Sequence, residues 1–208
     1  MKDRVCKLIK TLPLLAAMLS VTCVLTGCQS PKARPLSGSG AAHSTRNNCY
    51  SLLHQLLNDE KNVGLLRFIK QEEDDVKKLV KKIAANCAVG AQLLEEFAKD
   101  DPSIQLDDIR LPPGEAATRE AIGSTKKKEL LGQSGAEFEL TLLLTQAQAL
   151  SYGWHLAKVA GENEPQPDRA RALAGVSEDM QNLYHEVFVL LLSKTKSSAT
   201  NSMSAQPD

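Results

Sequence analysis

Cys28 follows a short apolar segment, and its sequence context predicts a chemical modification more clearly than that of any other residue. Residues 1–10 carry four basic side chains and one acid, and residues 12–25 are mainly apolar. A positive stretch followed by about 7–15 apolar residues is typical of a secretory signal peptide. The small residues Thr26 and Gly27 then lead directly to Cys28. We therefore expect a signal peptide over residues 1–27, with Cys28 as the modified first residue of the mature chain.

The tetrapeptide Leu25-Thr26-Gly27-Cys28 resembles the lipobox of bacterial lipoproteins, in which the cysteine is lipidated. The resemblance implies a lipid bilayer anchor of two or three acyl chains such as palmitate, because one chain alone binds only marginally. Gln29 is not the aspartate that retains many such proteins at the inner membrane, so an outer-membrane protein facing the periplasm is expected. Two alternatives stay open: an ordinary cleaved signal peptide in which Cys28 is incidental, and an uncleaved anchor.

Charge and aromatic content argue against a nucleic-acid partner. Removing residues 1–27 takes away four basic residues and one acid, and leaves 21 basic against 24 acidic residues. Nucleic-acid binding needs a basic surface, and base stacking needs aromatic side chains, which are 4% of this chain. The lysine run 126–128 is interpreted as a solvated helix face, with contact to phosphate or lipid headgroups as the alternative.

The mature chain is predicted to hold one folded domain between two polar ends. Residues 28–48 contain little apolar bulk, which favours a flexible tether after the anchor. Residues 195–208 are rich in Ser, Asn and other polar types, which favours a disordered tail. Residues 49–194 remain, and their number is normal for a single domain.

Four long segments of this domain have apolar residues at spacings of three and four, which predicts amphipathic helices. The first is residues 50–70, and the second runs from the acidic run 72–75 to just before Pro102. The third is residues 134–160, and the fourth is residues 168–193. Residues 101–133 are predicted to be a crossover with two short helical pieces, 115–122 and 125–131, each ended by a glycine. The pattern predicts an all-α domain, a four-helix bundle with a long crossover between its second and third helices.

The helix predicted for residues 134–160 has more apolar residues than one inner face needs. Ser134 and Glu137 fit a capping box at its start. The inner face is predicted to hold seven side chains: Phe138, Leu142, Thr145, Ala149, Tyr152, Leu156 and Val159. Four others are expected outside it, against the crossover or on a partner surface: Leu143, Leu144, Leu150 and Trp154.

The order of helix lengths, the crossover and the blocks 76–97, 138–158 and 179–191 resemble a bacterial envelope family. Members of that family are ferritin-like four-helix domains of unknown function. The resemblance implies histidines on the second, third and fourth helices. In this chain Cys87 and Leu150 stand near the first two positions, and only His185 matches the third.

A ferritin-like arrangement makes a di-iron site the obvious catalytic hypothesis. Such a site needs Glu from two helices and a Glu-x-x-His motif from each of the other two. The residues three positions before His54, His155 and His185 are Ser51, Tyr152 and Asn182. Glu60 is the carboxylate nearest to the predicted inner faces, and His43 lies in the predicted tether. We therefore expect no metal site and no cofactor.

Cys49 and Cys87 remain after signal cleavage, and an oxidising periplasm would permit a disulfide between them. Folding the first two helices together places Cys49 opposite about Leu94, roughly 10 Å from Cys87 along the helix. That offset exceeds the ~7 Å that a disulfide spans between Cα atoms, although residues before Tyr50 could fold back. The disulfide and a free Cys87 acting as a small core residue both stay open.

Motifs for haem attachment, phosphate loops and nucleophilic serines do not occur in the sequence. Arg119 is interpreted as an exposed ion pair with Glu115. The expected function is a non-catalytic, lipid-anchored envelope protein that binds a partner protein or supports cell-surface structure. The alternatives are a ferritin-like metal-binding protein or oxidoreductase, and a carrier of a small molecule.

Overall fold

The computed structural model describes residues 39–63 and 73–204, and the side chains of residues 44–63 and 73–196. These residues belong to one compact unit, Leu36–Asp208. They form five helices and no strand: α1 (Ser39–Glu60), α2 (Asp74–Asp100), α3 (Pro113–Gly132), α4 (Gly135–Glu162) and α5 (Pro167–Ser204). The all-α class is confirmed. The predicted signal peptide and Cys28 lie outside the described residues.

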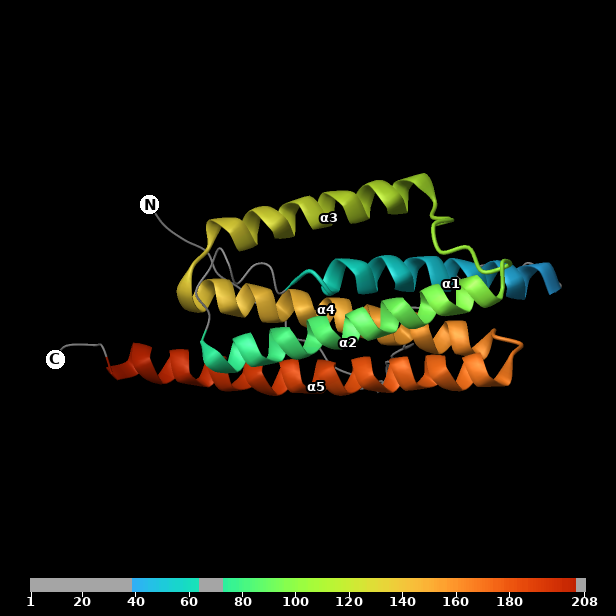
Figure 1. The fold of residues 1–208 in the computed structure, drawn as a ribbon. Coiled ribbons are helices and arrows are strands. Elements are labelled where there is room, and N and C mark those ends of the chain that lie inside the picture. The colour runs from blue at the N-terminus through green and yellow to red at the C-terminus, as the bar shows by residue number, and fades with distance from the viewer. Residues whose placement is uncertain (1–38, 64–72, 205–208) are drawn as a thin grey trace, which may run out of the picture. The chain divides into compact units, whose positions relative to one another are not determined.

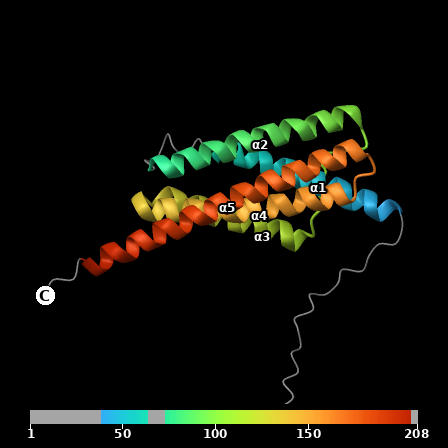
Figure 2. The ribbon, with the colours of Figure 1, turned by 90° about the horizontal axis from the view of Figure 1, so that it is seen from below.

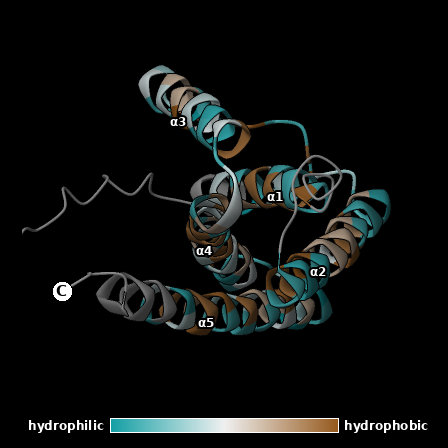
Figure 3. Ribbon diagram, turned by 90° about the vertical axis from the view of Figure 1, so that its left-hand side faces the viewer, coloured by the Kyte–Doolittle hydropathy of each residue, from teal (hydrophilic) through white to brown (hydrophobic). Residues whose placement is uncertain are grey.

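Four of the helices pack around a shared interior, and each runs antiparallel to the helices beside it (Figure 1). α1 packs against α2 and α4, and α5 packs against α4 and α2, with the most extensive packing between α4 and α5. Figure 2 shows α5 lying along α4 when the unit is seen from below. α3 carries the chain back from the end of α2 to the start of α4 and packs on α4 (Figure 3).

The buried face of α2 agrees with the sequence pattern. Its buried residues recur at spacings of three and four, as expected for an amphipathic helix: Val76, Leu79, Val80, Ile83, Cys87, Gly90, Ala91 and Leu94. Gly90 lies against Leu57 of α1, and a Cβ placed there would stand 3.2 Å from the Leu57 side chain. The predicted end of this helix before Pro102 is confirmed, because α2 ends at Asp100.

The inner face predicted for α4 was partly wrong. Leu143 and Leu150 are expected outside the inner face, against the crossover or on a partner surface, but both are fully buried members of the core. Tyr152 and Val159 are only partly buried. The reason is that α4 has neighbours on three sides, α1, α5 and α3, so its buried surface is wider than one stripe. Leu144 is half exposed and lies outside the buried core, as predicted, whereas Trp154 is partly buried and packs against the core.

The crossover contains one helix of 20 residues instead of two short pieces. α3 continues through Gly123, because an isolated glycine lowers helix stability by only about 1 kcal/mol and does not end a helix by itself. Ion pairs on either side of Gly123 support the helix: Glu115 with Arg119 at 2.7 Å, and Lys126 with Glu129 at 2.9 Å. The predicted exposed pair of Arg119 and Glu115 is confirmed.

Helices extend into both ends that we expected to be flexible. α1 begins at Ser39, so the second half of the predicted tether is helical. Tertiary contacts explain this, because Asn47 donates to the carbonyl of Ser103 at 2.7 Å and Asn48 accepts from the Arg110 amide at 3.0 Å. α5 continues to Ser204, ten residues past the predicted domain end at 194.

The start of α4 differs from the predicted capping box. Ser134 is the N-cap residue, but its side chain makes no capping hydrogen bond. Gly135 has a φ of 59°, so the first turn lacks the helical backbone that the box requires. Glu137 instead accepts a hydrogen bond of 3.2 Å from the Gln133 side chain.

Within the described residues, no helix combines the length and the apolar character needed to cross a membrane.

Candidate functional site

An apolar groove runs along the outer surface where α4 meets α5, and we call it the α4/α5 groove. Its volume is about 560 Å³. The lining residues are Leu144, Ala147, Gln148, Ser151, Tyr152 and His155 of α4, and Tyr184, Phe188 and Leu191 of α5. None of these carries a fixed charge. A furrow with this lining is suited to apolar groups, with the amide, hydroxyl and imidazole groups of its other residues as the available polar contacts.

Aromatic side chains concentrate at this groove. The chain has four Phe, three Tyr and one Trp, and half of these eight residues lie at or beside the groove: Tyr152, Trp154, Tyr184 and Phe188. The Tyr184 ring meets the edge of Trp154 at 5.1 Å and stacks on Phe188 at 6.3 Å. Rigid aromatic groups at a partly exposed surface are typical of protein recognition sites.

The groove histidine is held in place by its neighbours. His155 stacks on Trp154 with 4.6 Å between ring centroids, and its Nε2 accepts a hydrogen bond of 2.9 Å from Trp154 Nε1. This assigns the ring proton to Nδ1, which donates to the Ser151 carbonyl at 2.7 Å. Both nitrogens are therefore engaged, which favours a packing role for His155 over metal ligation or general-base catalysis.

Exposed apolar residues continue across α5 beyond the groove. Next to the groove residue Phe188, which is 47% exposed, Val189 is 67% exposed and Leu192 47%. On the other side of α5, a second groove of about 580 Å³ lies on the surface where α5 packs beside α2. Leu79, Val189 and Leu190 form its apolar part. Contiguous exposed apolar surface of this kind marks an interaction site more often than an isolated exposed side chain does.

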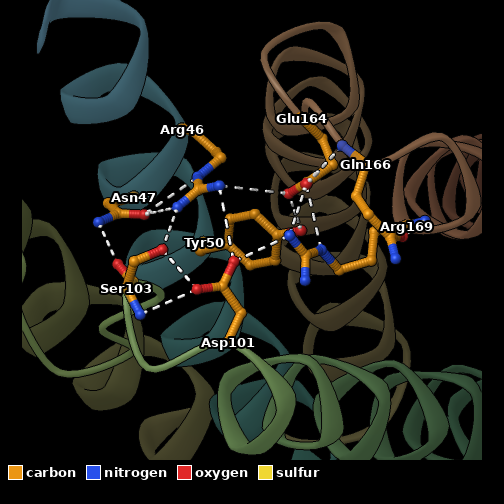
Figure 4. Close-up of polar contacts among 8 residues, drawn as sticks. All are labelled: Arg46, Asn47, Tyr50, Asp101, Ser103, Glu164, Gln166 and Arg169. Atoms are coloured by element: carbon orange, nitrogen blue, oxygen red, sulfur yellow. Dashed lines mark hydrogen bonds and ion pairs between the residues drawn. The ribbon is translucent and has the colours of Figure 1, made fainter.

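A buried polar cluster joins three distant parts of the chain at one end of the unit (Figure 4). The carboxylate of Glu164 is fully buried and accepts a hydrogen bond of 2.8 Å from Tyr50 Oη. Arg169 donates to the same carboxylate at 2.9 Å from Nη2 and at 3.1 Å from Nε, and to Asp101 at 2.9 Å. Arg46 Nη1 lies 3.9 Å from both Glu164 and Asp101.

The charges of this cluster balance, which indicates a structural role. Burial and the hydrogen bond to Glu164 raise the pKa of Tyr50, so its hydroxyl stays protonated. Hydrogen bonds from Ser103 lower the pKa of Asp101, and the two guanidinium groups lower it further. Two carboxylates thus face two permanent cations. The cluster fastens α1 to the loop after α2 and to the connection between α4 and α5.

A second buried polar pair lies between α1 and α4. Gln146 Nε2 donates to Glu60 Oε2 at 2.8 Å, and Gln146 Oε1 has no hydrogen-bond partner among the described residues. Burial raises the pKa of Glu60 to about 7. Burial, followed by the nearby Glu60, raises the pKa of Cys87 to about 12. Cys87 is therefore a protonated core thiol and a poor nucleophile.

The remaining predicted site residues are not brought together. Cys49 and Cys87 are both buried and free in the structure. His54 Nε2 lies 3.3 Å from Glu95 Oε1, whereas His185 packs against the edge of Tyr184 on another surface. The described ranges hold no group of three or more His, Cys, Asp or Glu residues placed to bind a metal ion. The side chain of His43 is outside those ranges.

Sequence reasoning missed the polar cluster because its members are scattered over more than 100 residues. Tyr50 and Glu164, for example, are 114 positions apart. No local motif joins them, and the pairing is seen only in the folded structure, where both side chains are buried side by side. The α4/α5 groove was partly anticipated, because the surplus of apolar residues on α4 already indicated a surface outside the core.

Comparisons with protein-family models, curated proteins and solved structures find no significant match to this chain.

Proposed function

We propose that this chain is a non-catalytic, lipid-anchored protein of the bacterial envelope that binds a helical segment of a partner protein. The observation that carries the proposal is the exposed aromatic α4/α5 groove. Three polar groups elsewhere in the unit support the non-catalytic part of the proposal, because each is engaged in a structural role. The buried acid Glu164 is paired with a cation, the thiol of Cys87 is held protonated, and His155 is engaged by neighbours.

The shape and lining of the groove favour a helix as the occupant. Two long antiparallel helices, α4 and α5, border the furrow, and its exposed apolar residues are suited to the apolar stripe of an amphipathic helix. Leu144 and Phe188 stand exposed in this furrow, and Tyr184 lies beside Phe188. The absence of fixed charge in the lining favours apolar anchors at positions i, i+3 or i+4 and i+7 of the partner.

The proposed scaffold is a four-helix bundle of ferritin-like order, made of α1, α2, α4 and α5. Its support is the ring of neighbours, in which α1 packs on α2 and α4, and α5 packs on α4 and α2. The long return connection through α3, between the second and third bundle helices, has the place that a crossover has in such folds.

The anchor and location are proposed from the sequence alone. The apolar segment 12–25, the small residues 26 and 27, and Cys28 support lipidation, and Gln29 supports the outer membrane. Cys28→Ala is expected to move the protein from the membrane fraction to a soluble or unprocessed form. An unchanged distribution in fractionated cells would contradict the anchor and leave the groove proposal standing.

Site-specific photo-crosslinking in intact cells tests the groove. A photoreactive phenylalanine analogue replaces Leu144 or Phe188, and a matched control replaces Val89, which is 69% exposed on α2. We expect one discrete crosslinked protein from both groove positions and none from Val89. Charged substitutions, Leu144→Glu and Phe188→Glu, should each abolish the crosslink formed from the other position. Equal crosslinking from all three positions, or none from the groove, would refute the proposal.

A further inference from the structure

Helix α3 is held to the rest of the unit by few contacts. Leu130 is its one buried residue, whereas Ile122 is 55% exposed and Leu131 45%. Its packing is mainly with α4 and is sparse, and the end-on view shows it standing beside α4, outside the other four helices (Figure 3). A helix of 20 residues is marginal in water without tertiary packing, so α3 depends on these contacts.

One polar contact joins the first half of α3 to α4. Arg119 Nη1 donates to Tyr152 Oη at 2.8 Å, and the guanidinium carbon lies 4.7 Å from the centre of the Tyr152 ring. The Arg119 Nε donates to Glu115, which orients the guanidinium from within α3. Tyr152 also lines the α4/α5 groove. The same side chain therefore touches α3 on one side and the groove on the other.

Both ends of α3 are attached to the packed unit. After α3, only Gln133 and Ser134 separate it from α4, and Gly135 takes a left-handed backbone. Before α3, the loop side chains of Ile104, Leu106, Ile109 and Leu111 pack on the core. The middle of α3 packs loosely, since nothing lies within 4 Å of a Cβ added at Gly123.

We propose that α3 is a strap that detaches from α4 and melts as one unit while the rest of the domain stays folded. Detachment breaks the Arg119–Tyr152 contact and uncovers the face of α4 on which α3 packs. It also releases the Tyr152 side chain, which lines the α4/α5 groove, so the strap controls access to that face of α4 and restrains one groove residue. Local units with little buried apolar area open at a lower free energy than the global unfolding reaction.

Hydrogen–deuterium exchange of the full-length protein tests the strap without any partner. We expect the amides of residues 117–131 to share one protection factor, at least tenfold lower than that of the central amides of α2. Arg119→Ala should accelerate exchange in α3 about a further tenfold, since it removes a hydrogen bond from a charged donor. Exchange in α2 and α5 should not change. Arg171→Ala, which removes the exposed pair with Asp168, is the matched control and should leave α3 unaffected.

A double-mutant comparison separates the specific contact from general loosening. Tyr152→Phe keeps the ring and removes the hydroxyl, so it should accelerate α3 exchange less than Arg119→Ala does. Adding it to Arg119→Ala should produce little further effect, because both act on one contact. Protection of α3 equal to that of α2, or equal acceleration throughout the domain, would overturn the strap. Neither result bears on the crosslinking test of the groove.

Discussion

Tyr50 and Glu164, 114 residues apart in the sequence, share a buried hydrogen bond of 2.8 Å from Tyr50 Oη to the Glu164 carboxylate. The bond joins α1 to the connection between α4 and α5. Arg169 pairs with the same carboxylate at 2.9 Å, so the buried charge has both a neutral donor and a cation as partners. Contacts between residues so far apart in the sequence fix the position of α1 relative to the connection between α4 and α5.

Glu164→Ala is expected to destabilise the domain by about 3–5 kcal/mol, because it leaves two guanidinium groups of the cluster, Arg46 and Arg169, with Asp101 as their one carboxylate partner there. Tyr50→Phe removes only one hydrogen bond and should cost about 1–2 kcal/mol. Urea unfolding followed by circular dichroism measures both. Equal losses for the two variants would contradict the view that the buried ion pair dominates this cluster.

Stability should depend on pH through Glu60. Burial raises its pKa from the ordinary 4.5 to about 7, so the folded state binds more protons than the unfolded state between those values. The free energy of unfolding therefore falls as pH rises from about 4.5 to 7, by up to about 3 kcal/mol.

Glu60→Gln removes this titration and imitates the protonated carboxyl. The variant should be more stable than the wild type at pH 8, and the difference should shrink toward pH 5. Urea unfolding at pH 5, 6, 7 and 8 gives the comparison, and the other titrating groups cancel between the two proteins. A difference that does not vary with pH would show that Glu60 ionises normally.

Gly153 lies where side chains of α1 and α5 pack tightly on α4. An added Cβ would lie 2.2 Å from Met180 Cε and 2.6 Å from Leu56 Cδ2, so both side chains would have to move. Gly153→Ala is expected to lower stability by about 1–3 kcal/mol through overpacking. Gly175→Ala is the matched control on α5, where nothing lies within 4 Å, and should raise stability by about 0.4–1 kcal/mol. Thermal unfolding of both variants tests the difference in sign.

Cys49 and Cys87 should react with a thiol reagent only after unfolding. Both are buried and free, and the pKa of Cys87 is raised to about 12, so little thiolate forms at pH 8. We expect no rapid reaction in the native protein and two reactive thiols per mature chain in denaturant without reductant. Finding none in denaturant would instead indicate that the two residues form a disulfide.

The sequence by itself determined the helical class, the buried face of α2 and the surplus of apolar residues on α4. These follow from periodicity and composition, which act within one or two helical turns. The same local reasoning failed at Gly123 and at Ser39, where a glycine and a polar stretch did not interrupt a helix. At Ser39 the reason is that distant residues hold α1, as Ser103 does for Asn47. At Gly123 the glycine penalty is small and ion pairs within α3 offset it.

Only the tertiary structure decided which apolar residues of α4 are core and which line a groove. Leu143 and Leu144 are adjacent and chemically identical, yet one is fully buried and the other is half exposed. The choice depends on where α1, α3 and α5 lie around α4, because a side chain is buried by its neighbours and not by its own type. The pairing of Tyr50 with Glu164 was decided in the same way, since the packing of the helices brings these two residues together.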